Sequence, residues 1–224
     1  MTPLMTSKTA WLAGATGLVG SLLLEELLAP QSPFHNVVTL GRRAPDFNNP
    51  RHTSAVVDFA RLEATAPQGP CHSAFCALGT TIKKAGSRRA FRAVDYDAVL
   101  AFARVAQSRG AAEFYLVSSV GSNTRSPLFY SRVKGAVEEA LGAMGFTKLV
   151  IARPSFLTGE RKEQRRGEKI AFAILEPLMP FLRGPLSGLK PTPAVNVAHA
   201  LVRLSTEGNS GVTVLEPRDI EESY

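Results

Sequence analysis

Hydrophobic and polar positions follow two different periods along this chain. Short apolar runs bounded by turn residues are typical of buried parallel strands, and longer stretches repeat their apolar residues at helical spacing. The clearest helical repeat covers residues 88–108 and ends at Arg109 and Gly110, a basic residue and then a glycine. The predicted strands are 9–13, 36–41, 55–59, 73–81 with its terminal turn, 114–119, 148–152 and 212–215, and the predicted helices are 21–28, 88–108, 127–144, 170–182 and 196–204.

Strands and helices that alternate in this way predict an α/β fold with a doubly wound parallel sheet, covered by helices on both faces. Its connections are expected to be right-handed, and its site is expected at the carboxyl ends of the strands. A chain of 224 residues is long enough for one domain with a large core. We therefore expect a single unit, in which residues from about 160 to 195 form a substrate-side portion.

The composition is that of an ordinary globular protein, with 45% hydrophobic and 20% charged residues. No apolar run is long enough to cross a bilayer, and residues 1–8 lack the charged-then-apolar order of a secretory signal. The default expectations are therefore no membrane contact and a cytoplasmic location.

The net charge of +7 comes from basic residues in four separate places, at 42–43, 83–84, 88–89 and 161–169. Because no single helix carries a basic stripe, nucleic acid is not an expected partner, and a phosphorylated cofactor accounts for part of the excess. The spacing of Cys71 and Cys76 matches no metal or redox motif. We expect buried or free thiols and no metal site.

Three glycines follow the first predicted strand with the spacing G-x-x-G-x-x-G and open the first helix. We assign Gly14 to a tight turn, Gly17 to close approach of phosphate to the backbone, and Gly20 to close packing of helix on strand. The helix start offers N–H groups and its positive dipole end to an anion. An ordinary strand-to-helix turn with incidental glycines is the alternative. The expected contacts of a dinucleotide pyrophosphate are Gly14, Ala15, Thr16, Gly17, Leu18, Val19 and Gly20.

The end of the second predicted strand indicates which dinucleotide binds. NAD-binding chains usually place Asp or Glu there for the ribose 2′-hydroxyl, whereas this chain has Gly41 followed by Arg42 and Arg43. Two guanidinium groups suit a 2′-phosphate, so we predict NADPH or NADP rather than NAD. Alternatively, the arginines only end a strand at a solvated surface. Asp58, at the end of the third predicted strand, is a candidate acceptor for the adenine amine or a turn-forming residue.

Candidate catalytic residues lie on the fifth predicted strand and the helix after it. Tyr130 and Lys134 are four residues apart and therefore share one helix face. We expect Tyr130 to exchange a proton with a substrate oxygen, and the ammonium of Lys134 to favour the phenolate form and to bind the nicotinamide ribose. Ser118 and Ser119 are both eligible to hold the substrate oxygen, and we favour Ser119. In the alternative, the helix is solvated and Tyr130 packs against the sheet.

Several short motifs follow one another between residues 9 and 160. They are Gly14-Ala-Thr-Gly-Leu-Val-Gly20, Leu40-Gly-Arg-Arg43, Cys76-Ala-Leu-Gly-Thr-Thr81, Val94-Asp-Tyr-Asp97, Ser118-Ser119 with Gly121, Tyr130-Ser-Arg-Val-Lys134-Gly135 and Arg153-Pro154. In these motifs the chain resembles the atypical short-chain dehydrogenases, whose fold is the Rossmann fold. The resemblance weakens after residue 160, where family members differ in their substrates.

The resemblance implies further cofactor contacts. They lie at the glycine turn, the arginine pair, the turn after the fourth strand, the strand end at Ser118, the Tyr130 and Lys134 pair, and the backbone after the sixth strand, which would cover the nicotinamide. The residues added in this way are Leu78, Gly79, Thr80, Ser118, Pro154, Ser155 and Leu157.

The last third of the chain gives weaker signals. Residues 160–169 hold five cations and are expected to be a solvated loop or a lid that recruits an anion. The apolar stretch 170–182 is a candidate pocket floor or dimer surface. His199 is expected to be a packed or surface residue rather than a ligand.

The function predicted from the sequence is an NADPH-dependent oxidoreductase acting on a small carbonyl or alcohol, as a monomer or homodimer, with its substrate unknown. One alternative is a regulator that senses NADPH and binds a protein partner without turnover. A sugar-nucleotide epimerase is a third candidate, disfavoured by the short region after residue 160 and by the arginine pair.

Overall fold

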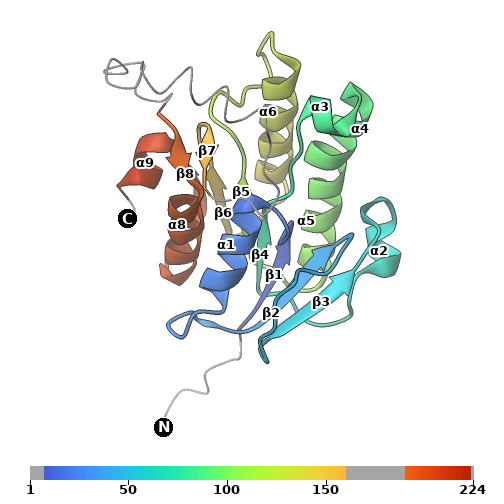
Figure 1. The fold of residues 1–224 in the computed structure, drawn as a ribbon, viewed down its shortest axis with the longest axis vertical. Helices are drawn as coiled ribbons and strands as arrows, with labels where there is room; N and C mark the ends of the chain where they lie inside the picture. The colour runs from blue at the N-terminus through green and yellow to red at the C-terminus, as the bar shows by residue number, and fades with distance from the viewer. Residues whose placement is uncertain (1–7, 160–189, 223–224) are drawn as a thin grey trace.

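Seven parallel strands form one sheet in the order β3-β2-β1-β4-β5-β6-β9 in the computed structural model, which describes residues 8–159 and 190–222 (Figure 1). Every neighbouring pair in this sheet is parallel, which confirms the predicted doubly wound α/β fold. The strands are β1 (Lys8–Ala13), β2 (Phe34–Gly41), β3 (His52–Val56), β4 (Ser73–Cys76), β5 (Glu113–Val117), β6 (Lys148–Ala152) and β9 (Gly211–Leu215).

Helices cover both faces of the sheet because successive strand residues point to opposite sides. In β1, Ala10 and Leu12 join the core with α1 and α8, whereas Trp11 and Ala13 join the core with α2, α5 and α6. Figure 1 shows these two layers on either side of the strands. The helices are α1 (Leu18–Leu27), α2 (Leu62–Thr65), α3 (Ile82–Ala85), α4 (Arg88–Arg92), α5 (Ala98–Ser108), α6 (Phe129–Gly142), α8 (Ala194–Thr206) and α9 (Pro217–Glu221).

The strand order reverses between β1 and β4. From β1 the chain moves outward to β2 and β3, and then returns to place β4 on the other side of β1. The crevice outside the carboxyl ends of two such strands is the usual ligand site of an open α/β sheet. The turns that begin at Gly14 and Ala77 border this crevice.

Three predicted elements need correction. The third strand is β3 and ends at Val56 rather than at residue 59, because the carboxylate of Asp58 caps a 3₁₀ turn at Phe59–Arg61. The connection after β4, in which no helix was predicted, contains the short helix α3, which Thr81 caps by accepting from the backbone N–H of Lys84. The predicted helix 88–108 is divided into α4 and α5 by a π-helical turn at Ala93–Asp97.

A second, two-stranded parallel sheet lies beyond the end of β6. It pairs β7 (Leu157–Thr158) with β8 (Thr192–Pro193) and so joins the loop after β6 to the start of α8. The predicted basic loop 160–169 and helix 170–182 lie outside the described residues. Among the helices that are described, none is long and apolar enough to span a bilayer.

Candidate functional site

The glycine turn joins β1 to α1 and has the tight geometry expected of it. Gly14 has a φ of 91°, and a Cβ atom on it would lie 2.6 Å from the carbonyl oxygen of Ala77. A Cβ atom on Gly20 would overlap the carbonyl oxygen of Gly14, which shows how closely α1 packs on the turn. Among the described residues, a Cβ atom on Gly17 would meet only the Gly14 oxygen, at 3.3 Å. No other described residue fills the space around Gly17, at the start of α1.

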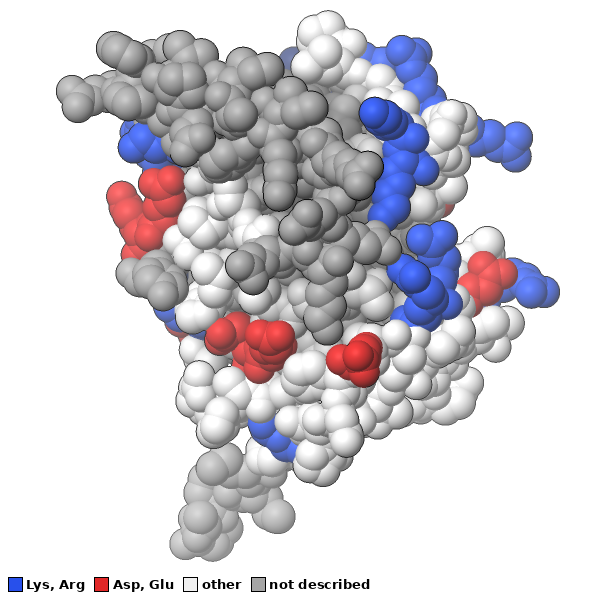
Figure 2. Space-filling view, in the orientation of Figure 1, with Lys and Arg blue, Asp and Glu red and all other residues white. Residues whose placement is uncertain are grey.

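The arginine pair follows the carboxyl end of β2. Arg42 and Arg43 are both exposed, directly after Gly41. Figure 2 shows lysine and arginine side chains gathered on the right-hand side of the face, the side on which α3 and α4 lie in Figure 1. The cationic side of the molecule is therefore the side that carries the turns after β2 and β4.

Asp58 has a local role in the structure. Its Oδ1 accepts a hydrogen bond from the backbone of Ala60 at 3.0 Å, and its Oδ2 lies 3.3 Å from the Nε of Arg61. The turn-forming alternative therefore describes what this side chain does here, and a contact with adenine stays a prediction.

Tyr130 and Lys134 lie in the first turns of α6, and Lys134 has a partner that sequence analysis missed. The Nζ of Lys134 lies 3.2 Å from the Oδ1 of Asp95, and their side chains are only 4% and 1% exposed. The Tyr130 ring packs on Phe91, with centroids 5.4 Å apart. Burial alone would lower the pKa of Lys134, but the carboxylate of Asp95 and the Tyr130 phenol outweigh it, so that this pKa lies above its usual value.

Asp95 also holds the turn after β4. Its Oδ2 accepts a hydrogen bond from the backbone N–H of Thr80 at 2.9 Å, and a Cβ atom on Gly79 would lie 3.5 Å from its Oδ1. Burial raises the pKa of Asp95, and the ammonium of Lys134 opposes this shift. The sequence carried one signal of this role, because Asp95 occupies an apolar position in the helical repeat of residues 88–108.

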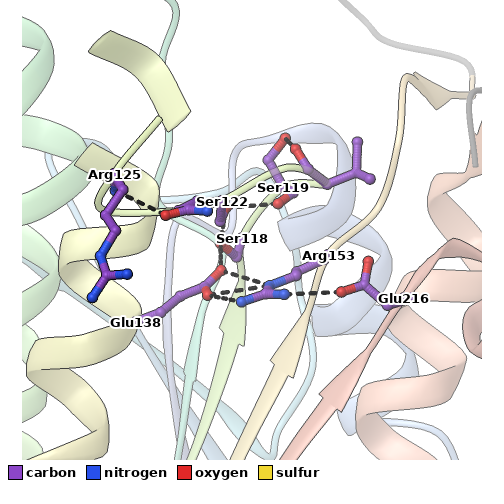
Figure 3. Close-up of polar contacts among 9 residues, drawn as sticks. Ser118, Ser119, Ser122, Arg125, Glu138, Arg153 and Glu216 are labelled. Atoms are coloured by element: carbon purple, nitrogen blue, oxygen red, sulfur yellow. Dashed lines mark hydrogen bonds and ion pairs between the residues drawn. The ribbon is translucent and has the colours of Figure 1, made fainter. Parts of the chain in front are cut away.

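The two candidate serines differ in their surroundings. The Oγ of Ser118 donates to the buried carboxylate of Glu138 and lies 3.1 Å from the Oγ of Ser122 (Figure 3). Within residues 8–159 and 190–222, the Ser119 hydroxyl makes only a long contact, 3.4 Å, with the carbonyl oxygen of Val120. Ser118 is therefore engaged within the protein, and the Ser119 hydroxyl is the freer of the two.

Glu138 and Arg153 tie the end of β5 to the end of β6 and to α9. Arg153 Nη2 lies 2.6 Å from Glu138 Oε2, and its Nη1 lies 2.9 Å from Glu216 Oε1, at the N-cap of α9 (Figure 3). Neither glutamate was predicted as a site residue, because no local sequence pattern indicates an ion pair between residues so far apart in the chain. A surface hollow of about 340 Å³ is lined by the loop after β5, by residues of α6 that include Glu138, by β6 and β9, and by Arg153.

The backbone after β6 lies beside the end of β5. The carbonyl of Pro154 accepts a hydrogen bond from Val120 at 2.9 Å, and the backbone N–H of Ser155 donates to the Thr192 hydroxyl at 3.1 Å. Leu157 follows in β7. The structure thus brings the predicted cover of the nicotinamide next to the candidate serines.

Residues expected to have no catalytic role are either paired or buried. His199 lies 2.8 Å from Glu26 and links α8 to α1. Cys71 and Cys76 are free and buried, and burial raises the pKa of Cys76 to about 12. The described residues contain no group of three or more metal-ligating side chains.

A strand–glycine turn–helix unit at the switch point of a parallel sheet defines the class of Rossmann-type nucleotide-binding proteins. Residues 10–178 match the model of the NAD dependent epimerase/dehydratase family, and the chain belongs to that family. The match supports the resemblance to short-chain dehydrogenases drawn from the motifs.

Individual relatives agree with this assignment. The chain is 39% identical to rat protein HTATIP2 over 171 residues, which are 75% of this chain and 70% of the relative. It is 33% identical to the protein FMP52, mitochondrial, of Candida albicans, over 91% of this chain and 90% of the relative. The Bordetella bronchiseptica enzyme WbmH in complex with NAD⁺ has the same fold, with a TM-score of 0.67 at 14% identity, covering 94% of this chain and 76% of that structure.

These names correct one expectation. Several relatives are named mitochondrial, so the cytoplasmic location expected from the sequence is wrong. The expectation depended only on finding no recognisable targeting segment. Composition and the pattern of core residues reflect how a chain folds and do not indicate where in the cell it lies.

Proposed function

We propose that this protein is an NADPH-dependent oxidoreductase that acts on a small carbonyl or alcohol. The observation that carries the proposal is the position of Tyr130 and Lys134. Both lie at the start of α6, and the partner of Lys134, Asp95, also binds the turn after β4 at the sheet's switch point. A proton-transfer group and the expected nucleotide crevice are thus adjacent.

The residues present fit a dinucleotide. The open space at Gly17 allows a pyrophosphate to approach the backbone at the N-terminus of α1, where the helix dipole favours negative charge. When bound, the nicotinamide supplies or accepts the hydride, while the protein supplies binding, orientation and charge.

The protein's own residues would then handle the proton. Tyr130 exchanges it with the substrate oxygen, and the buried ammonium of Lys134 lowers the cost of the phenolate. Ser119, whose hydroxyl is freer than that of Ser118, holds the substrate oxygen. The carbonyl carbon can then face the nicotinamide.

A 2′-phosphate on the cofactor is favoured by Arg42 and Arg43, which are exposed and follow a small residue at the end of β2. Replacing both arginines by alanine should weaken binding of NADPH far more than binding of NADH. Equal weakening would show that the pair does not contact the 2′-phosphate. From the names of the fungal relatives, a mitochondrial location is proposed for this chain as well.

The deciding experiment mixes the protein with NADPH and a panel of aldehydes, ketones and quinones, and follows the absorbance of the reduced cofactor. Tyr130→Phe should abolish turnover and leave the Kd for NADPH within a few-fold. Tyr96→Phe is the matched control, because its ring packs under Arg92 at 4.1 Å and phenylalanine keeps that ring. Unchanged turnover in Tyr130→Phe would remove the phenol from the mechanism.

A protein that binds NADPH tightly but oxidises it with no member of the panel would instead be a cofactor-sensing regulator. A small-molecule substrate and a monomeric or homodimeric state belong to the enzyme proposal, and neither nucleic acid nor a membrane is part of it. Sedimentation with and without NADPH would measure the oligomeric state.

A further inference from the structure

The buried ion pair of Asp95 and Lys134 has a role beyond neutralising two buried charges. We propose that Asp95 is a positioning residue that fixes the Lys134 ammonium beside Tyr130 and, with its second oxygen, holds the Thr80 turn at the nucleotide crevice. The inference rests on the proposed oxidoreductase function, since it concerns how Lys134 is kept ready for that reaction.

The hydrogen-bond geometry requires a carboxylate at this position. Asp95 accepts from Lys134 Nζ at 3.2 Å through Oδ1 and from the Thr80 N–H at 2.9 Å through Oδ2. Both neighbours are donors, and asparagine, which has the same shape, offers only one acceptor oxygen and places an N–H₂ group against the other donor. No neutral side chain of this size can serve both partners.

The ammonium keeps donors for other partners. A protonated lysine has three N–H donors, and the structure directs one of them to Asp95. The other two are left for further acceptors, such as a ribose hydroxyl, without breaking the ion pair. Asp95 can therefore hold the lysine in place before and during cofactor binding.

Asp95 also sets the charge of Lys134. The groups that act on the ammonium are the carboxylate of Asp95 from the π-helical turn, the phenol of Tyr130 on the same helix, and the thiol of Cys76 from β4. Burial raises the Cys76 pKa to about 12, so this thiol is neutral at ordinary pH. The carboxylate is thus the group that offsets the burial of the lysine near neutral pH.

The backbone around Asp95 supports a functional reading over a purely structural one. Asp95 lies in the π-helical turn Ala93–Asp97, which packs against α6, and such turns are frequent at functional sites. Asp95 lies between the buried residues Phe91 and Val99, where an apolar side chain could fill the space. Proteins with apolar residues in place of a buried ion pair are often at least as stable. An ion pair at this place is explained by a need for the charge itself.

Asp95→Asn tests the proposal. We expect kcat at neutral pH to fall at least about tenfold, and the basic limb of the pH profile to move down by about one unit, because the buried ammonium loses its counter-ion. Asp97→Asn is the matched control, in the same turn but with a side chain 59% exposed, and it should leave both unchanged. An unmoved basic limb in Asp95→Asn would overturn the proposal.

A double-variant cycle separates positioning from a general loss of structure. In a Lys134→Met background, Asp95→Asn should change the residual kcat and the Kd for NADPH by less than about twofold, because the single amide oxygen of asparagine can still accept from the Thr80 N–H once the lysine is absent. Equal losses in both backgrounds would overturn the proposal. If Asp95→Asn alone does not fold, the double variant should still fold, because it removes both buried charges. The test is then the Kd for NADPH of the double variant against that of Lys134→Met, which should agree within about twofold.

The proposed function can fail separately. Should the wild-type protein show no turnover with the whole panel, the oxidoreductase proposal falls, and the Kd cycle for NADPH still tests Asp95. Non-additive Kd values would support its positioning role, and additive values would refute it.

Discussion

Gly17, the N-cap of α1, and Gly20, three residues later inside the helix, have different surroundings. A Cβ atom on Gly20 would overlap the Gly14 carbonyl oxygen, whereas a Cβ atom on Gly17 would touch, among the described residues, only that oxygen, at 3.3 Å. We therefore predict that Gly20→Ala mainly damages the fold and that Gly17→Ala mainly damages cofactor binding.

The magnitudes follow from the two environments. In Gly20→Ala the start of α1, the helix that buries Leu23, Leu24 and Leu27, must move away from the turn at Gly14 and Ala15. Such overpacking costs about 3 kcal/mol at the upper end of the usual range, which lowers Tm by roughly 6–12 °C in a chain of this size. Gly17 has a φ of −85°, which alanine adopts freely, so Gly17→Ala costs about 1 kcal/mol or less as a poorer N-cap.

Thermal unfolding followed by circular dichroism measures the first effect, and titration of NADPH fluorescence measures the second. In Gly17→Ala the added methyl group would occupy the space proposed for the pyrophosphate, and the Kd should rise at least about tenfold, or 1.4 kcal/mol. Gly142→Ala is the control, because a Cβ atom there has no neighbour within 4 Å among the residues that the structure describes. Equal losses of Tm in Gly17→Ala and Gly20→Ala would refute the division of tasks, as would normal NADPH binding by Gly17→Ala.

Three further results are expected. Cys71 and Cys76 should react with a thiol reagent at least about a thousandfold more slowly in the folded protein than after unfolding, because burial raises both pKa values and blocks access, and Ellman's reagent measures this. Glu138→Gln should lower Tm by roughly 4–8 °C, or about 2 kcal/mol, since Arg153 loses the more buried of its two charged partners but keeps Glu216 and is partly exposed; an unchanged Tm would contradict this. Burial lowers the pKa of His52, so its contribution to stability is present above pH 6.5 and is lost as pH falls through the lowered value, and denaturant titrations of His52→Gln should show a weaker acid loss than wild type.

The sequence was sufficient for those parts of the fold that depend on local patterns. Strand position followed from short apolar runs, and the glycine turn was recognisable because its spacing, the strand before it and the helix after it agree. The bounds of β3 were wrong because the Asp58 side chain competes for the backbone and starts a turn. The π-helical turn in residues 93–97 was missed because its apolar residues still fit a helical repeat.

Only part of the candidate site could be predicted from the sequence. The residues that were missed are the hydrogen-bond and ion-pair partners of the predicted ones. Tyr130, Lys134 and the serines were given roles from their motifs. Asp95 stood in a motif without a role and lies 39 residues from Lys134, and Glu138 lies 20 residues from Ser118. No spacing rule links such pairs, because a parallel sheet brings separate crossovers together only after folding.

Polar burial nevertheless follows a rule that could guide a search in other chains of this fold. Residues in the middle of β1, β4 and β6 are apolar, and Asp95, Lys134, Ser118 and Glu138 lie buried around the carboxyl ends of β4 and β5. Burying charge is costly unless it is paired, so an acidic residue at an apolar position of a crossover helix near the switch point signals a buried cationic partner. Lys134 is the cation of the tyrosine motif. The Asp95 carboxylate is therefore evidence for the proposed nucleotide-dependent site that is independent of the glycine turn, because it comes from a different part of the chain.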